Sequence, residues 1–120
     1  MEWKITVHEN YIEIVTDGIA DSESSMRMAD AIKNTMRSNR VTRALIDHSH
    51  LENVSGNTIE IYDRPGMFKI IGGIFRIKIA EIIKPEHREH FQFFETVCKN
   101  QGFQFSIFQD RGQALEWLLL

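Results

Sequence analysis

The chain has 120 residues, of which 42% are hydrophobic, and its 14 basic and 17 acidic side chains leave a net charge of −3. That length suits a single domain, residues 1–120, whose core is large enough to need no disulfide or metal support. The slightly acidic balance argues against a dedicated nucleic-acid binder. The single cysteine excludes an internal disulfide framework and a zinc site of four thiolates, and it favours a reducing compartment, so we expect a cytoplasmic protein.

The sequence shows no sign of an export signal or a membrane segment. Met1 is followed by the charged residues Glu2 and Lys4, whereas a signal peptide places an apolar segment after its positive charges. No apolar run approaches the ~20 residues that a helix needs to cross a bilayer. We therefore expect a soluble domain without a transmembrane segment.

Alternating apolar and polar residues over positions 1–16 predict a β-hairpin. Three polar residues at positions 8–10 suit the connecting loop, and we expect Asp17 and Gly18 to end the second strand. The alternation sets the register, because a slip by one residue would turn the apolar side chains to solvent. The apolar positions of the hairpin are Trp3, Ile5, Val7, Ile12 and Ile14.

Residues 21–39 have the pattern of an amphipathic helix. Asp21 is a suitable N-cap, and Arg37 and Arg40 at the other end complement the negative pole of the helix dipole. The apolar stripe that we expect to face the core consists of Met26, Ala29, Ile32 and Met36.

The middle of the chain predicts a strand, a loop and a helix. Residues 42–47 contain a nearly continuous apolar run, which indicates burial on both faces, as in a central parallel strand. We expect a loop over residues 48–54. The next helix should begin at residues 55–57, kink at Pro65 and end at about residue 71.

The last third of the chain alternates strands and helices. The longest predicted strand spans residues 74–83, and a helix over residues 85–100 follows it. A strand over residues 103–107 precedes a final helix that Asp110 caps. The residues of the 85–100 helix expected to face inward are Phe91, Phe94, Val97 and Cys98.

The predicted order of elements is β-β-α-β-α-β-α-β-α. Because helices recur between strands, the connections after the hairpin should be right-handed parallel crossovers. We therefore predict an α/β domain with a five-stranded mixed sheet, four strands parallel and one antiparallel, and helices packed against it.

Three stretches of the sequence resemble one known family. Residues 45–51 (LIDHSHL) are similar to the end of the central strand in anti-sigma-factor antagonists, and Ser55 and Gly56 stand where the antagonist pattern Asp-Ser-Ser-Gly opens a helix. Residues 108–118 (FQDRGQALEWL) are similar to the closing strand and helix of the SpoIIAA-like (STAS/SEC14-type) group of small bacterial proteins. The resemblance implies a SpoIIAA-like (STAS) fold and a non-enzymatic regulatory module that docks to a protein partner.

The resemblance also implies a phosphorylation site at Ser55. In the antagonists, a partner kinase phosphorylates the serine directly before the glycine, so the implied partners are a kinase or a protein resembling an anti-sigma factor. A phosphate at a helix N-terminus would meet free backbone N–H groups and the positive end of the dipole. Asn53 and Val54 replace the Asp-Ser pair of the pattern, and the alternative is that Ser55 is only an N-cap or a loop residue.

We expect the docking surface around residues 48–54 and the start of the next helix. Residues 117–120 carry more apolar side chains than one amphipathic turn can hide, which favours a homodimer. The candidate docking residues are His48, Ser49, His50, Asn53, Ser55 and Gly56.

A basic and apolar stretch offers a second hypothesis. Residues 64–88 carry six basic and two acidic side chains, a local charge of +4 in a chain of net charge −3. Such a mixture can form a patch that binds a lipid or another small amphiphile near residues 67–78. The alternative is that the apolar members belong to the core, while Arg76 and Lys78 protect an outer strand face against edge pairing. The candidate ligand-binding residues are Met67, Phe68, Ile71, Phe75, Arg76 and Lys78.

The sequence contains no motif for catalysis, so we expect neither an enzyme nor a cofactor. His48 and His50 are paired by strand spacing, and His87 and His90 by helical spacing, but neither pair has further ligands at suitable positions. We predict no metal site, and a solvated helix face explains the second pair. Cys98 lies on the apolar side of its helix and is predicted to be a core residue.

Overall fold

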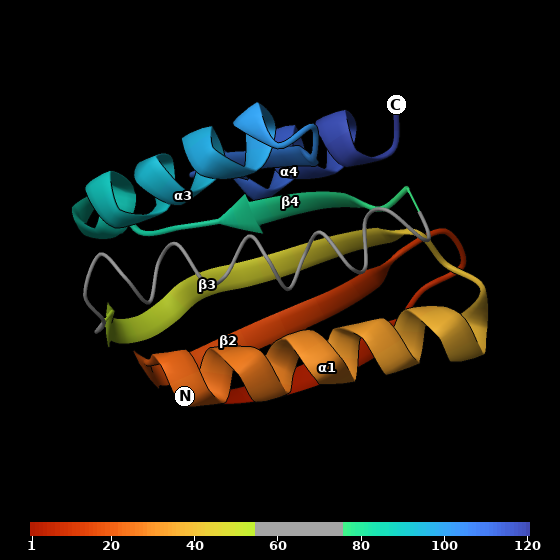
Figure 1. The fold of residues 1–120 in the computed structure, drawn as a ribbon, viewed down its shortest axis with the longest axis horizontal. Helices are drawn as coiled ribbons and strands as arrows, with labels where there is room; N and C mark the ends of the chain where they lie inside the picture. The colour runs from red at the N-terminus through yellow and green to blue at the C-terminus, as the bar shows by residue number, and fades with distance from the viewer. Residues whose placement is uncertain (55–75) are drawn as a thin grey trace.

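The computed structural model describes residues 1–54 and 76–120 and shows a five-stranded sheet (Figure 1). The strands lie in the order β1-β2-β3-β4-β5, with β1 antiparallel to β2 and each later pair of neighbours parallel. This arrangement confirms the predicted mixed sheet. The helix predicted up to residue 71 lies outside the described residues. The strands are β1 (Glu2–Val7), β2 (Ile12–Ala20), β3 (Arg43–Val54), β4 (Lys78–Ile82) and β5 (Gln104–Phe108).

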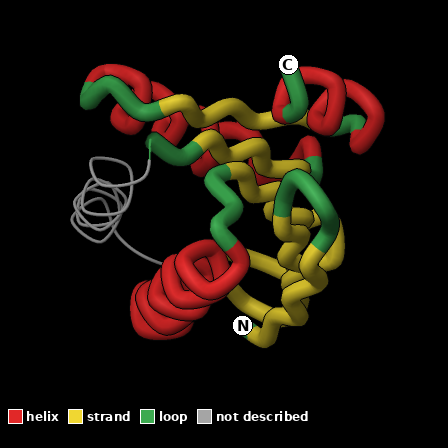
Figure 2. The backbone as a smooth tube through the Cα atoms, turned by 90° about the vertical axis from the view of Figure 1, so that its right-hand side faces the viewer, coloured by secondary structure: helices red, strands yellow, loops and turns green. Residues whose placement is uncertain are grey.

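Helices cover both faces of the sheet. Helices α1 (Ser22–Asn39) and α3 (Arg88–Asn100) pack on one face, and α4 (Arg111–Leu118) packs on the other. A 3-10 turn, η1 (Pro85–His87), leads into α3. In Figure 2, helix α1 is seen nearly along its axis and lies to one side of the strands. Among the helices of the described residues, none is long and apolar enough to cross a membrane.

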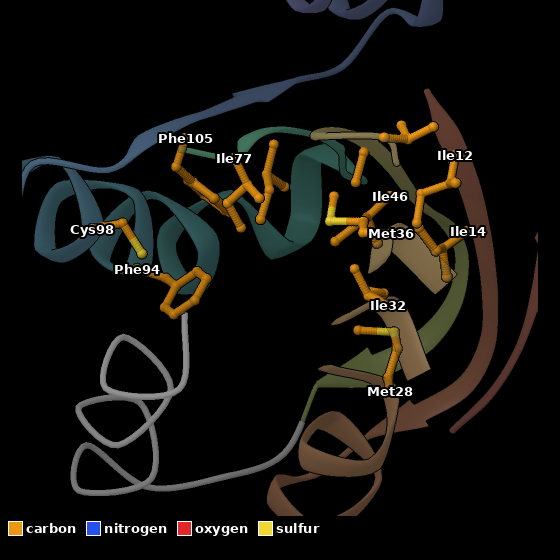
Figure 3. Close-up of a cluster of buried hydrophobic side chains, with 13 residues drawn as sticks. Ile12, Ile14, Met28, Ile32, Met36, Ile46, Ile77, Phe94, Cys98 and Phe105 are labelled. Carbon is orange, nitrogen blue, oxygen red and sulfur yellow. The ribbon is translucent and has the colours of Figure 1, made fainter. Parts of the chain in front are cut away.

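The main core lies between the sheet and the pair of helices α1 and α3. Met28 and Ile32 of α1 and Phe94 of α3 meet the strand residues Ile14 and Ile46 there (Figure 3). The predicted inward face of the 85–100 helix is confirmed for Phe91, Phe94 and Cys98, which are buried, while Val97 is half-buried.

Helix α1 has the predicted cap, and Ala29, Ile32 and Met36 of the predicted inward stripe are buried. The Asp21 carboxylate accepts a hydrogen bond from the Ser24 backbone N–H at 2.7 Å, and Arg40, with φ of 54°, ends the helix in the left-handed conformation. Met28 is buried, whereas Met26, which we had predicted to face the core, is 48% exposed. Two residues correspond to about 200° around a helix, so Met26 and Met28 cannot share one face.

Strands β2 and β3 are both longer than predicted. Asp17 and Gly18 do not end β2, which continues to Ala20 through a register irregularity after Gly18. Residues 48–54, predicted as a loop, are the second half of β3 and pair with residues 17–20 of β2. A β-bulge interrupts the strict alternation of apolar and polar residues that marks a strand. Residues 48–54 therefore carry no sequence pattern that predicts a strand.

Strand β4 is shorter than the predicted 74–83 strand and lies inside the sheet. Arg76 precedes it in the left-handed conformation, with φ of 50°. Strand β4 lies between β3 and β5, so Lys78 is not at a sheet edge. The alternative that Lys78 protects an outer strand against edge pairing is therefore wrong. Lys78 Nζ instead donates a hydrogen bond to the Trp117 carbonyl at 2.6 Å and lies 4.4 Å from the Trp117 ring centroid. Burial, with a smaller contribution from Arg43, lowers the pKa of the Lys78 ammonium.

Helix α4 has the predicted cap, because the Asp110 carboxylate accepts a hydrogen bond from the Gln113 N–H at 2.8 Å. Leu118 is fully buried, so the exposed apolar side chains of the tail are Leu119, at 42%, and Leu120, at 79%. A homodimer formed through this tail stays a prediction.

An ion pair joins the start of α4 to the hairpin, and its removal should show in the pH dependence of stability. The Arg111 guanidinium donates two hydrogen bonds to the Glu13 carboxylate and holds the pKa of Glu13 below its usual range. Arg111→Gln should therefore raise the pKa of Glu13 and lower the free energy of unfolding at neutral pH by about 0.2–1 kcal/mol.

This loss should vanish as the pH falls through the folded-state pKa of Glu13, because a carboxyl with a depressed pKa stabilises the fold only while it is ionised. Urea unfolding at neutral and acidic pH, with NMR titration of the Glu13 carboxyl, measures both effects. An equal loss in acid would contradict the role of the ion pair.

Candidate functional site

The carboxyl ends of β2, β3, β4 and β5 meet at one edge of the sheet, because these strands are parallel. Ligands of open α/β sheets commonly bind outside this edge. The candidate docking residues of β3 lie in the second half of the strand, which ends at this edge. His50 and Asn53 are exposed, Ser49 is half-buried, and Ser55 and Gly56 lie outside the described residues.

His48 is buried, at 3% exposed, which corrects the expectation that it lies in an exposed loop. His48 and His50 do not point the same way, because the register between β2 and β3 shifts between Val15 and Asp17, opposite this part of β3. In the described parts of the chain, no three histidine, cysteine or acidic side chains gather as metal ligands.

Three adjacent strands hold the His48 ring in a buried polar network. His48 Nδ1 lies 2.7 Å from the Thr16 hydroxyl of β2, and His48 Nε2 lies 3.6 Å from Glu81 Oε2 of β4. The ring also stacks on Phe91 of α3, with 5.0 Å between the ring centroids. Glu81 is 3% exposed, and its Oε2 makes no hydrogen bond within the described structure.

This network lines a small cavity of about 30 Å³ between the sheet, α1 and α3. Its other walls are mostly apolar, and they include Met28, Ala29 and Phe94. Sequence reasoning missed Glu81 as a site residue, although a lone carboxylate within the run IAEII is a signal of a functional or paired buried charge.

A larger groove of about 480 Å³ lies between the end of β3 and the η1–α3 corner. We call it the β3–α3 groove. Phe93 is 39% exposed there, whereas His87 is only 7% exposed and its Nδ1 has no hydrogen-bond partner among the described residues. The burial of His87 corrects the prediction that His87 and His90 share a solvated helix face. The groove is lined by Asn53, Val54, Glu86, His87, Glu89, His90 and Phe93.

Cys98 is buried as predicted. Its burial, reinforced by the negative charges of Glu81 and Glu95, raises the pKa of the thiol to about 12. The thiol therefore stays protonated at neutral pH and is a poor nucleophile.

The candidate ligand-binding residues are only partly described. Met67, Phe68, Ile71 and Phe75 lie outside the described residues, and Arg76 is exposed. Lys78 shares its strand face with Ala80 and Ile82, which pack against α4, whereas the cavity lies on the opposite face of the sheet. The structure thus places Lys78 away from the cavity.

Solved structures of known proteins have the same fold as this chain. No protein-family model matches the sequence, and no curated protein matches it either. An uncharacterized protein from Shewanella loihica with a SpoIIAA-like fold is 20% identical, with a TM-score of 0.60 over 98% of this chain and 92% of that one.

Two further solved structures are similar over comparable lengths. An anti-sigma factor antagonist from Mycobacterium paratuberculosis is 12% identical, with a TM-score of 0.66 over 99% of this chain and 94% of that one. The Bacillus cell fate determinant SpoIIAA, in its phosphorylated form, is 13% identical, with a TM-score of 0.59 over 96% of this chain and 97% of that one. The chain has the SpoIIAA-like fold, as its sequence resemblance predicted.

Proposed function

We propose that this protein is a non-enzymatic binding module that docks a protein partner through the β3–α3 groove. The observation that carries the proposal is the groove itself, where Val54 and the exposed Phe93 ring lie among polar side chains. A partly exposed aromatic ring in a groove is the type of residue that supplies binding energy at protein interfaces. The fold of the antagonists supports the same class of function.

A phosphorylation switch at Ser55 is part of the proposal. Ser55 directly follows Val54, which lines the groove, and two glutamates, Glu86 and Glu89, line it as well. A phosphate on Ser55 would add nearly two negative charges one residue after Val54 in the chain, and this added charge would change which partner the groove accepts. A kinase and a protein resembling an anti-sigma factor are the proposed partners.

Pull-down with purified variants tests the groove and the switch. Phe93→Ala and Ser55→Asp should each change capture of the protein that the wild-type chain retains, while Ser55→Ala should retain it. Glu116→Ala is the matched surface control, because Glu116 is exposed on α4, which packs on the opposite face of the sheet. Equal capture by wild type and Phe93→Ala, or no specific capture by the wild type, would contradict docking through the groove.

Binding of a small amphiphile is the second candidate function. The cavity beside His48 and Glu81 favours it, because its walls are mostly apolar and the polar side chains that line it are those of Ser25, His48 and Glu81. Sites of this composition are typical of small-molecule binding. Native mass spectrometry of the purified protein tests this function, since a co-purifying mass supports it and repeated absence argues against it.

A further inference from the structure

Strand β5 forms one edge of the described sheet. Its neighbour there is β4, so the backbone N–H and C=O groups of every second residue point away from the sheet. Ile107 is one of these residues, because the next carbonyl, that of Phe108, accepts a hydrogen bond from the Ile83 N–H at 2.9 Å on the β4 side. Such an edge can pair with a strand of another molecule unless something blocks it.

Glu95 of α3 occupies the outward amide of this edge. Its Oε2 accepts a hydrogen bond from the Ile107 N–H at 2.7 Å and a longer one from the Ser106 hydroxyl at 3.3 Å. The other oxygen, Oε1, lies 3.7 Å from Lys99 Nζ, but an ion pair at the surface holds a side chain only weakly. A hydrogen bond from a backbone N–H to a carboxylate is stronger than one between neutral groups, so the contact with Ile107 holds the side chain on β5.

Among the described residues, side chains and not a helix or strand stand over this part of the edge. A groove of about 480 Å³ lies beside it, lined by residues 106–108 of β5, by Gln113 of α4 and by side chains of α3 that include Gln92 and Glu95. The groove gives another strand access to β5. Glu95 reaches across it and takes the donor that a pairing strand would need.

We propose that Glu95 keeps the β5 edge from pairing with a second copy of this chain. A second copy fits this edge, because two identical strands that lie antiparallel about a two-fold axis offer each other the same outward donors and acceptors. Such a strand would have to displace Glu95 from Ile107 and leave its carboxylate without that donor, which costs free energy. The homodimer predicted from the C-terminal tail would therefore use a different surface.

Two substitutions of Glu95 separate the reach of its side chain from its charge. Glu95→Asp keeps the charge but is one methylene shorter, so its carboxylate no longer reaches the Ile107 N–H, whereas Glu95→Gln keeps the length and an acceptor oxygen. In sedimentation velocity over a range of protein concentrations, Glu95→Asp should self-associate about tenfold more tightly than the wild type, and Glu95→Gln should sediment as the wild type does. Glu116→Asp, the same substitution at an exposed position of α4, should also leave sedimentation unchanged. A folded Glu95→Asp variant that sediments as the wild type, or equal association of Glu95→Gln and Glu95→Asp, would overturn the proposal.

Hydrogen exchange of the Ile107 amide, followed by NMR, locates the contact. In dilute Glu95→Asp this amide should exchange about tenfold faster than in the wild type, and it should slow again as the variant associates. Self-association without this renewed protection would place the contact elsewhere and overturn the proposal. If Glu95→Asp does not fold, the wild type decides. Protection of the Ile107 amide there supports the proposal, and exchange as fast as in an unstructured chain would overturn it.

Discussion

Replacing Phe94 with alanine is expected to lower the free energy of unfolding by about 3–5 kcal/mol, the typical cost of removing a buried aromatic side chain. Phe94 is 2% exposed and packs edge-on against Phe105 of β5, with 5.1 Å between the ring centroids. The truncation would open a void between α3 and the sheet, which the surrounding helices and strands cannot fully close. Urea unfolding followed by circular dichroism measures the loss.

The neighbouring ring is the control for this prediction. Phe93 is 39% exposed, so Phe93→Ala should cost less than about 1 kcal/mol. In the pull-down, Phe93→Ala should change capture of the partner, because Phe93 lines the β3–α3 groove. Phe94→Ala, where it is folded, should retain the partner, because Phe94 does not line the groove. Equal losses of stability would show that α3 does not present the face described here to the sheet.

Removing the Thr16 hydroxyl is expected to lower the free energy of unfolding by about 1–3 kcal/mol. Thr16 is fully buried, and Thr16→Val keeps its shape while leaving His48 Nδ1 without its partner. A buried ring nitrogen without a hydrogen bond carries the full cost of its lost hydration, which explains the size of the effect. Thermal and urea unfolding measure it, and the NMR signals of the His48 imidazole should shift.

Two substitutions separate the hydrogen bond from other effects. Thr6→Val makes the same change at an exposed position of β1 and should alter stability by less than about 0.5 kcal/mol. Thr16→Ser keeps the hydroxyl and should preserve the His48 imidazole signals. If Thr16→Val were neutral and left those signals unchanged, the buried network would not contribute to the fold.

The features that could be predicted from the sequence have local signals. Asp21 and Asp110 cap helices because their carboxylates reach backbone N–H groups three residues ahead. The hairpin follows from alternation within 16 residues, and the burial of Cys98 follows from helical spacing. The order of these local elements, with the rule for crossover connections, was enough to predict the mixed sheet.

The candidate site depended on contacts between distant parts of the chain. The second half of β3 is polar, and it is a strand because it pairs with β2, about 30 residues earlier. Alternation along β3 places His48 on the same face as Ile46, and the pairing of β3 with β4 brings Glu81 to it. The sequence by itself determined the type and order of the described elements, because each has a core segment with its own periodicity or cap. Only the tertiary structure decided which polar side chains are buried together, because strand register is set by the partner strand and not by the segment alone.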